Sequence, residues 1–237
     1  MYPHTAEGVG LLLIDEDVLF LKEIFPFYEG LSHQEKFAFT SNLVREAYQK
    51  DKIILSQEDE CNGVILVKSG QLRAYLNSDE GKEITLYRLL SNDVCIMTAS
   101  CVLKNITFTV TLEVEKDSVL YFLPASIWSS LSNANAKIKE FELELVSTRF
   151  SEVMWVMEQV VFKGMGNRLA AFLLEQATLE ETDFITITHE TIAKNLGTAR
   201  EVISRMLKYF ETEGLVEMSR GTVKIVNHKK LTAMTLS

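Results

Sequence analysis

The 237-residue chain lacks the features that mark secreted, membrane-bound or disulfide-stapled proteins. No basic run precedes an apolar stretch near Met1, and the short run Val9 to Ile14 is followed at once by three acidic residues. We therefore expect neither a signal peptide nor a membrane span. The three cysteines are an odd number and are too widely spread for a disulfide framework or a CxxC zinc site. These absences favour a reducing cytoplasm.

Catalytic motifs are also scarce. The four histidines are scattered, only three prolines and eleven glycines occur, and no glycine-rich loop is present that would cradle a phosphate. No nucleophile, base and orienting residue can be assembled from short motifs, so the sequence argues against an enzyme.

Positive charge is scarce in most of the chain but not at its C-terminal end. The net charge of −9, taken whole, argues against a nucleic-acid partner. From Lys194 to Ser237, however, eight basic residues outnumber four acidic ones, which gives +4 against −13 for the preceding 193 residues. A basic C-terminal module could bind phosphates while the acidic remainder repels stray contacts with DNA. Chance clustering on a solvated face is the alternative.

The first half of the chain changes from helical to strand periodicity. Apolar residues at helical spacing predict helices over residues 17–49, interrupted at Pro26 and Gly30. Short β-rich runs follow, with turn signals at Lys68-Ser69-Gly70 and Asp79-Glu80-Gly81. Strands at short intervals without intervening helices predict an antiparallel roll or barrel. The predicted strands cover residues 53–55, 64–67, 72–76, 84–89, 107–114 and 119–123.

Residues 135–162 contain neither glycine nor proline and predict one long helix. Six apolar residues recur at alternating steps of three and four, the spacing of a coiled-coil dimer seam. The alternative is a helix that lies on its own domain, which extra apolar residues such as Trp155 would also support. Gly164 and Gly166 then predict a hinge. The seam residues are Leu143, Val146, Phe150, Val153, Met157 and Val160.

After the hinge, a helix from Arg168 and a strand over residues 184–188 lead into the pattern of a helix-turn-helix. Ala193, Gly197 and Ile203 fall where that motif needs a small residue at the helix contact, a glycine of positive φ and an apolar packing residue. Thr188 is placed to cap the first helix. Two later strand runs, 214–217 and 223–226, predict a wing whose tip carries Arg220.

The second helix of this motif starts with a polar turn suited to the major groove. Arginine there can pair with guanine, and a carboxylate can accept a hydrogen bond from cytosine. One alternative is a solvated face with a Glu201–Arg205 ion pair, and another is a winged helix that contacts a protein. The predicted base contacts are Glu201, Ser204 and Arg205, with Arg200 on a base or phosphate and Thr188, Thr198 and Arg220 on phosphates.

With these parts in order, almost the whole chain resembles the Crp/Fnr superfamily of bacterial transcription regulators. The most specific stretches are residues 187–193 and 198–205, and the Glu-x-x-Ser-Arg pattern of the second stretch is similar to the Fnr branch. The resemblance implies a cytoplasmic homodimer on double-stranded DNA, with RNA polymerase as a further partner. It also implies a palindrome of TTGA-like half-sites, centred about one helical turn apart.

The resemblance implies an α+β fold in three parts. A jelly roll like that of cyclic-nucleotide-binding domains, with N-terminal helices, is expected over residues 1–134. A dimerisation helix over 135–163 and a winged helix-turn-helix domain over 164–237 follow.

The effector stays open, because the chain departs from the family at the residues that would bind it. Cyclic-nucleotide binders of this family use a Gly-Glu pair for the ribose and an arginine for the phosphate. Here no arginine lies between Arg88 and Arg149, and no glycine between Gly81 and Gly164. These departures argue against cyclic AMP. DNA binding without any effector is a further alternative.

Cofactors of the family find little support either. Iron-sulfur members of the Fnr branch need four cysteine ligands, whereas this chain has three cysteines in all. Cys95 and Cys101 lie where the nucleotide pocket is expected, either as a redox or ligand-binding pair or as small buried hydrophobes. No motif supports haem at His4 or His33.

Overall fold

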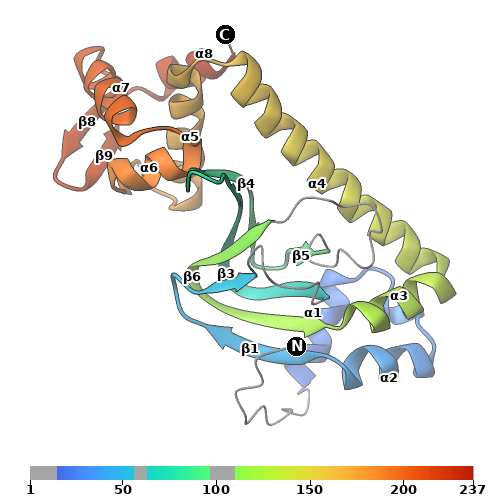
Figure 1. Ribbon diagram of the computed structural model, residues 1–237. Helices are drawn as coiled ribbons and strands as arrows, with labels where there is room; N and C mark the ends of the chain where they lie inside the picture. Colours follow the sequence, from blue (N-terminus) through green and yellow to red (C-terminus); the bar gives the residue numbers. More distant parts are fainter. Residues whose placement is uncertain (1–14, 56–62, 97–109, 237) are drawn as a thin grey trace. The chain divides into compact units, whose positions relative to one another are not determined.

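The computed structural model describes residues 15–55, 63–96 and 110–236, which fall into two compact units (Figure 1). The first unit comprises residues 1–74 and 87–150, and the second comprises residues 75–86 and 151–237. No helix in the described ranges is both long and apolar enough to span a membrane.

The first unit contains a six-stranded sheet, and two of its strands, β3 and β4, continue into the second unit. The main order is β1-β6-β3-β4, with β2 beside β6 and β5 beside β3. The pairs β1–β6, β2–β6 and β3–β5 are antiparallel, and Val44 lies opposite Phe122. The predicted antiparallel roll is therefore confirmed. The strands are β1 Val44–Tyr48, β2 Ile53–Leu55, β3 Val64–Asn77, β4 Glu83–Leu90, β5 Val94–Cys95 and β6 Thr111–Leu123.

Two local predictions in this region are wrong. The helix expected through residue 49 ends early, because residues 44–48 form β1 and take their backbone partners from β6. The turn expected at Lys68-Ser69-Gly70 lies inside the continuous strand β3. Gly70 has a φ of 101°, and a Cβ on it would lie 2.1 Å from Ser118 Oγ. This glycine therefore allows β3 to pass close to β6, and it does not reverse the chain.

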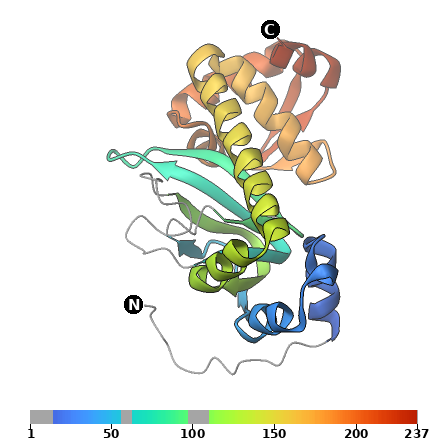
Figure 2. The same ribbon diagram turned by 90° about the vertical axis from the view of Figure 1, so that its right-hand side faces the viewer.

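The short helices of the first unit lie near one end of the sheet (Figures 1 and 2), and aromatic side chains form much of the core between them. The ring centroid of Phe25 lies 5.1 Å from that of Phe39 and 6.0 Å from that of Trp128. The buried carboxylate of Glu142 accepts hydrogen bonds from Trp128 Nε1 at 3.0 Å and Ser132 Oγ at 2.6 Å, which fixes the long helix α4 to α3. The helices are α1 Asp15–Ile24, α2 His33–Ser41, α3 Ala125–Ala134 and α4 Ala136–Phe162, with a short 3-10 helix η1 at Tyr28–Gly30.

The long helix predicted from the absence of glycine and proline is confirmed, since α4 is continuous from Ala136 to Phe162. The break after it is shorter than expected, because α5 begins at Met165 and not near Arg168. Gly164 is the extended residue before α5, whereas Gly166 lies within the helix.

Four helices and a small antiparallel sheet make up the C-terminal part of the second unit. The sheet has the order β7-β9-β8, with Ile185 opposite Val223 and Met218 also opposite Val223. The helices are α5 Met165–Leu179, α6 His189–Leu196, α7 Arg200–Thr212 and α8 His228–Leu236, and the strands are β7 Phe184–Thr186, β8 Val216–Ser219 and β9 Thr222–Ile225.

Candidate nucleic-acid interface

Helices α6 and α7 form the predicted helix-turn-helix. The Thr188 hydroxyl accepts a hydrogen bond from the backbone amide of Thr191 at 3.0 Å, so the predicted cap of α6 is confirmed. Gly197 ends α6 with φ 64° and ψ 39°, the left-handed conformation predicted for the turn. Ala199 then starts α7 from an extended backbone.

Buried packing fixes which face of α7 is presented to solvent. Ala193 is 2% exposed, and Ile203 is fully buried against the core that α6 shares with α5. Leu207 and Phe210 continue this buried side of α7, four and seven residues after Ile203. The polar face of α7 therefore lies away from the core and has little freedom to rotate.

The outward face of α7 carries the predicted base contacts. Arg200, Glu201, Ser204 and Arg205 are all exposed. No described side chain caps the N-terminus of α7, so its first backbone amides are free to meet an anion such as a DNA phosphate. The arrangement combines hydrogen-bond donors, one carboxylate acceptor and the positive end of a helix dipole.

The solvated-face alternative included a Glu201–Arg205 ion pair, and no such pair is formed among the residues that the structure describes. The exposed polar face itself fits both readings. Sequence reasoning missed Lys208, which is exposed on α7 at i+4 from Ser204 and i+3 from Arg205. Helical spacing alone could have identified it. Its ammonium group adds a third cation to this face, beside Arg200 and Arg205.

The wing contributes one further basic residue. Arg220 is exposed in the turn between β8 and β9, where Gly221 takes a φ of 75°. Thr198, two residues before the first residue of α7, is half-buried. Six of the seven predicted DNA contacts therefore come from the cap, turn and second helix of one motif, and Arg220 comes from the adjoining wing.

The long helix α4 exposes an unusual number of large apolar side chains. Phe150 is 65% exposed, and four of the six predicted seam residues have exposed fractions of 45% or more. Val146 differs, because it packs partly buried against the core of the first unit, and Val153 is half-buried. Exposed apolar stretches of this kind mark contact surfaces. The exposed members are Leu143, Phe150, Met154, Trp155, Met157, Val160, Val161 and Phe162.

The predicted cysteine pair is only partly described. Cys95 lies on β5, is 1% exposed and has its Sγ 4.0 Å from the hydroxyl oxygen of Tyr87. Cys101 lies outside the described residues. Burial makes Cys95 a packing residue in this conformation, and its redox role stays a prediction.

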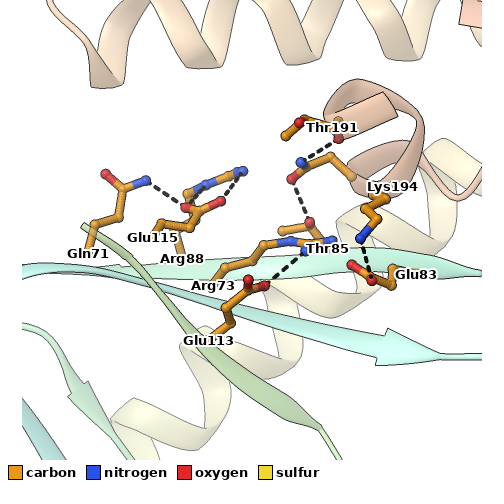
Figure 3. Close-up of polar contacts among 10 residues, drawn as sticks. Gln71, Arg73, Glu83, Thr85, Arg88, Glu113, Glu115, Thr191 and Lys194 are labelled. Carbon is orange, nitrogen blue, oxygen red and sulfur yellow. Dashed lines mark hydrogen bonds and ion pairs between the residues drawn. The ribbon is translucent and has the colours of Figure 1, made fainter. Parts of the chain in front are cut away.

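Buried arginines of the first unit are already paired with carboxylates (Figure 3). Glu115 accepts from Arg88 Nε at 2.8 Å and Nη2 at 3.2 Å, and from Gln71 Nε2 at 2.7 Å. Burial alone would raise the pKa of Glu115, but the charge and hydrogen bonds of Arg88 outweigh burial and lower that pKa. Arg73 Nη1 likewise lies 3.4 Å from a Glu113 oxygen.

Arg149 reaches from α4 to the same sheet. Its guanidinium carbon lies 4.9 Å from the centroid of the Tyr87 ring, and its Nη2 lies 4.0 Å from Asp93 Oδ1. Each buried arginine of the described roll thus has a carboxylate within 4.0 Å. Positive charge there is compensated without a phosphate ligand.

Comparison with known proteins gives consistent matches along the chain. The model of a Crp-like helix-turn-helix domain matches residues 167–234, and that of a cyclic nucleotide-binding domain matches residues 45–135. A solved structure described as a transcriptional regulator of the Crp/Fnr family from Eubacterium rectale is 46% identical, with a TM-score of 0.87 over 91% of this chain and 100% of that one.

Proteins of lower sequence identity give matches of the same kind. Electron transport regulator A of Shewanella oneidensis is 26% identical over 197 residues, which are 79% of this chain and 76% of that protein. The structure of FixK2 from Bradyrhizobium japonicum is 18% identical and has the same fold, with a TM-score of 0.65 over 81% of this chain and 96% of that one.

Proposed function

This chain belongs to the Crp/Fnr family of transcription regulators, and we propose that it binds, as a homodimer, a DNA palindrome with TTGA-like half-sites. The observation that carries the proposal is the outward face of α7, where Glu201, Ser204 and Arg205 are exposed together on a helix whose other side is buried. Side chains at the start of such a helix reach base edges in the major groove.

A dimer supplies the two-fold symmetry that a palindrome requires. The exposed apolar residues of α4, among them Leu143, Phe150 and Met157, support this helix as the contact between two copies of the chain. RNA polymerase as a further partner, in the cytoplasm, rests on the family alone.

The direct test is fluorescence anisotropy at fixed salt with a TTGAT-N4-ATCAA duplex and a scrambled duplex of the same composition. We expect tighter binding to the palindrome. Because phosphate contacts alone are insensitive to sequence, equal binding to both duplexes would contradict the proposed half-site.

Replacing Arg205 by alanine is expected to weaken binding to the palindrome by about 1–3 kcal/mol, or roughly five- to 150-fold, because a base-contacting guanidinium is removed. Binding to the scrambled duplex should change much less. The matched control is Arg45→Ala, which removes the same charge from an exposed position on β1. An equal loss on both duplexes would assign Arg205 to a phosphate, and no loss would favour a protein partner for the winged helix.

Cyclic AMP is expected to leave the affinity for the palindrome unchanged within about twofold. The chain has no arginine between Arg88 and Arg149 for the nucleotide phosphate, and both of these arginines already face carboxylates. The same anisotropy assay, with and without added cyclic AMP, measures this. A clear rise in affinity would contradict the expectation and would place the nucleotide in the roll.

A further inference from the structure

The far end of the β3–β4 hairpin lies against the helix-turn-helix. Residues 75–86 belong to the same compact unit as the winged helix, although the rest of both strands belongs to the roll. A tight turn closes this end, with the amide of Ser78 donating to the carbonyl of Lys82 at 2.8 Å and Gly81 at a φ of 74°. The hairpin end is thus an ordered element, and its position bears on α6.

Two polar contacts join the hairpin to the C-terminal half of α6 (Figure 3). The hydroxyl of Thr85 donates to Asn195 Oδ1 at 2.7 Å. Asn195 is 5% exposed, and its Nδ2 donates to the carbonyl of Thr191 at 2.9 Å, so its side chain is held within its own helix. Lys194 Nζ lies 3.4 Å from Glu83 Oε1.

The backbone of the hairpin also approaches the turn between α6 and α7. A Cβ built on Gly197 would lie 3.4 Å from the carbonyl oxygen of Glu83 and 3.4 Å from Ile84 Cβ. Three consecutive hairpin residues, 83–85, therefore contact α6 and its turn. Gly197 is the left-handed residue on which the direction of α7 depends.

The contact between the hairpin and α6 leaves the outward face of α7 exposed. Arg200, Glu201, Ser204 and Arg205 are exposed while the hairpin is in place, so the hairpin holds the turn without covering the residues that would meet DNA. We propose that Thr85 and Glu83 are positioning residues for DNA recognition, acting through Asn195 and Lys194 to hold the α6–α7 turn. This inference rests on the proposed function.

The two contacts are expected to stabilise the turn by different amounts. The Thr85–Asn195 hydrogen bond is partly buried and has a well-oriented acceptor, so it carries most of the effect. The Glu83–Lys194 pair contributes less, because the Lys194 side chain is 53% exposed and solvent screens the pair. β3 and β4 continue from this point into the sheet of the roll, so the hairpin end is covalently joined to the roll and contacts the turn through these non-covalent interactions.

The test uses the full chain and the palindromic duplex. Thr85→Val keeps the side-chain shape but removes the donor, and we expect its Kd to rise roughly three- to tenfold. Thr85→Ser keeps the hydroxyl and should bind within about twofold of the unaltered chain. Glu83→Gln should weaken binding more than Glu80→Gln, which removes the same charge from a 75% exposed side chain of the same hairpin. Equal affinities for Thr85→Val and the unaltered chain would overturn the positioning role.

A second readout needs no DNA. Hydrogen exchange at the amides of residues 194–201 reports how firmly the turn is held, and Thr85→Val should speed it while Thr85→Ser should not. Unchanged exchange in Thr85→Val would overturn the hairpin contact itself. If the unaltered chain failed to prefer the palindrome, the proposed function would fall, while the exchange measurement would still decide whether the hairpin holds the turn.

Discussion

Phe150→Asp is expected to turn the dimer into monomers and to weaken binding to the palindrome by roughly a hundredfold or more. Phe150 is 65% exposed at the centre of the apolar residues of α4, where a carboxylate would be desolvated by the partner chain. Two half-sites bound by linked monomers gain about 10²–10⁴ in affinity over a single half-site, and the substitution removes that gain. Light scattering after size-exclusion chromatography measures the mass, and anisotropy measures the affinity.

The matched control is Thr148→Asp, an exposed position two residues earlier and so on the far side of the same helix. It adds the same charge and should leave both mass and affinity unchanged. A Phe150→Asp protein that stays dimeric would remove α4 as the dimer contact and would return the helix to the alternative in which it serves only its own chain.

Gly70→Ala is expected to lower the free energy of unfolding of the roll by about 3–5 kcal/mol. Gly70 has a φ of 101°, which L side chains rarely adopt, and its Cβ would lie 2.1 Å from Ser118 Oγ and 2.5 Å from the carbonyl oxygen of Asp117. The second neighbour is backbone, so relief requires β3 and β6 to separate. Denaturant unfolding followed by circular dichroism measures the change, with two transitions allowed for two units.

Gly81→Ala distinguishes the cost of a positive φ from the cost of the close contact between β3 and β6. Gly81 also has a positive φ, 74°, but nothing lies within 4 Å of a Cβ built on it. Its substitution should therefore cost only about 1–2 kcal/mol of backbone strain. Equal costs for Gly70→Ala and Gly81→Ala would mean that the close approach of the two strands contributes nothing.

The helix-turn-helix could be predicted from sequence because its signals are local. The cap at Thr188, the left-handed Gly197 and the buried Ile203 lie within 16 consecutive residues, and each is required by the motif itself. The long helix was equally accessible, since the absence of glycine and proline over residues 135–162 is visible in the sequence alone.

The errors in the roll arose from partners distant in sequence. Residues 44–48 have helical apolar spacing, yet they pair with residues 118–122 as a strand. Gly70 in a local Lys-Ser-Gly stretch indicates a turn, whereas its conformation is set by Ser118 across the sheet. Helix α3 had no separate signal between the strand before it and the long helix after it.

The same limit applies to the candidate site. Lys208 could have been found by helical spacing, because it shares a face with Ser204 and Arg205. The Thr85–Asn195 contact could not, since 110 residues separate its two members and Thr85 belongs to no motif. The sequence predicts DNA-contacting residues because they belong to a local motif, whereas a contact between residues distant in the sequence is visible only in the structure.

Dimerisation through the apolar face of α4 would make promoter occupancy depend steeply on the concentration of the protein. On a palindrome that needs two copies of the chain, and at concentrations where monomers predominate, occupancy rises with the square of the protein concentration. A twofold change in synthesis would then change occupancy about fourfold at low saturation. If the exposed residues from Leu143 to Phe162 form the proposed dimer contact, occupancy of the palindrome would therefore fall more steeply than the amount of protein.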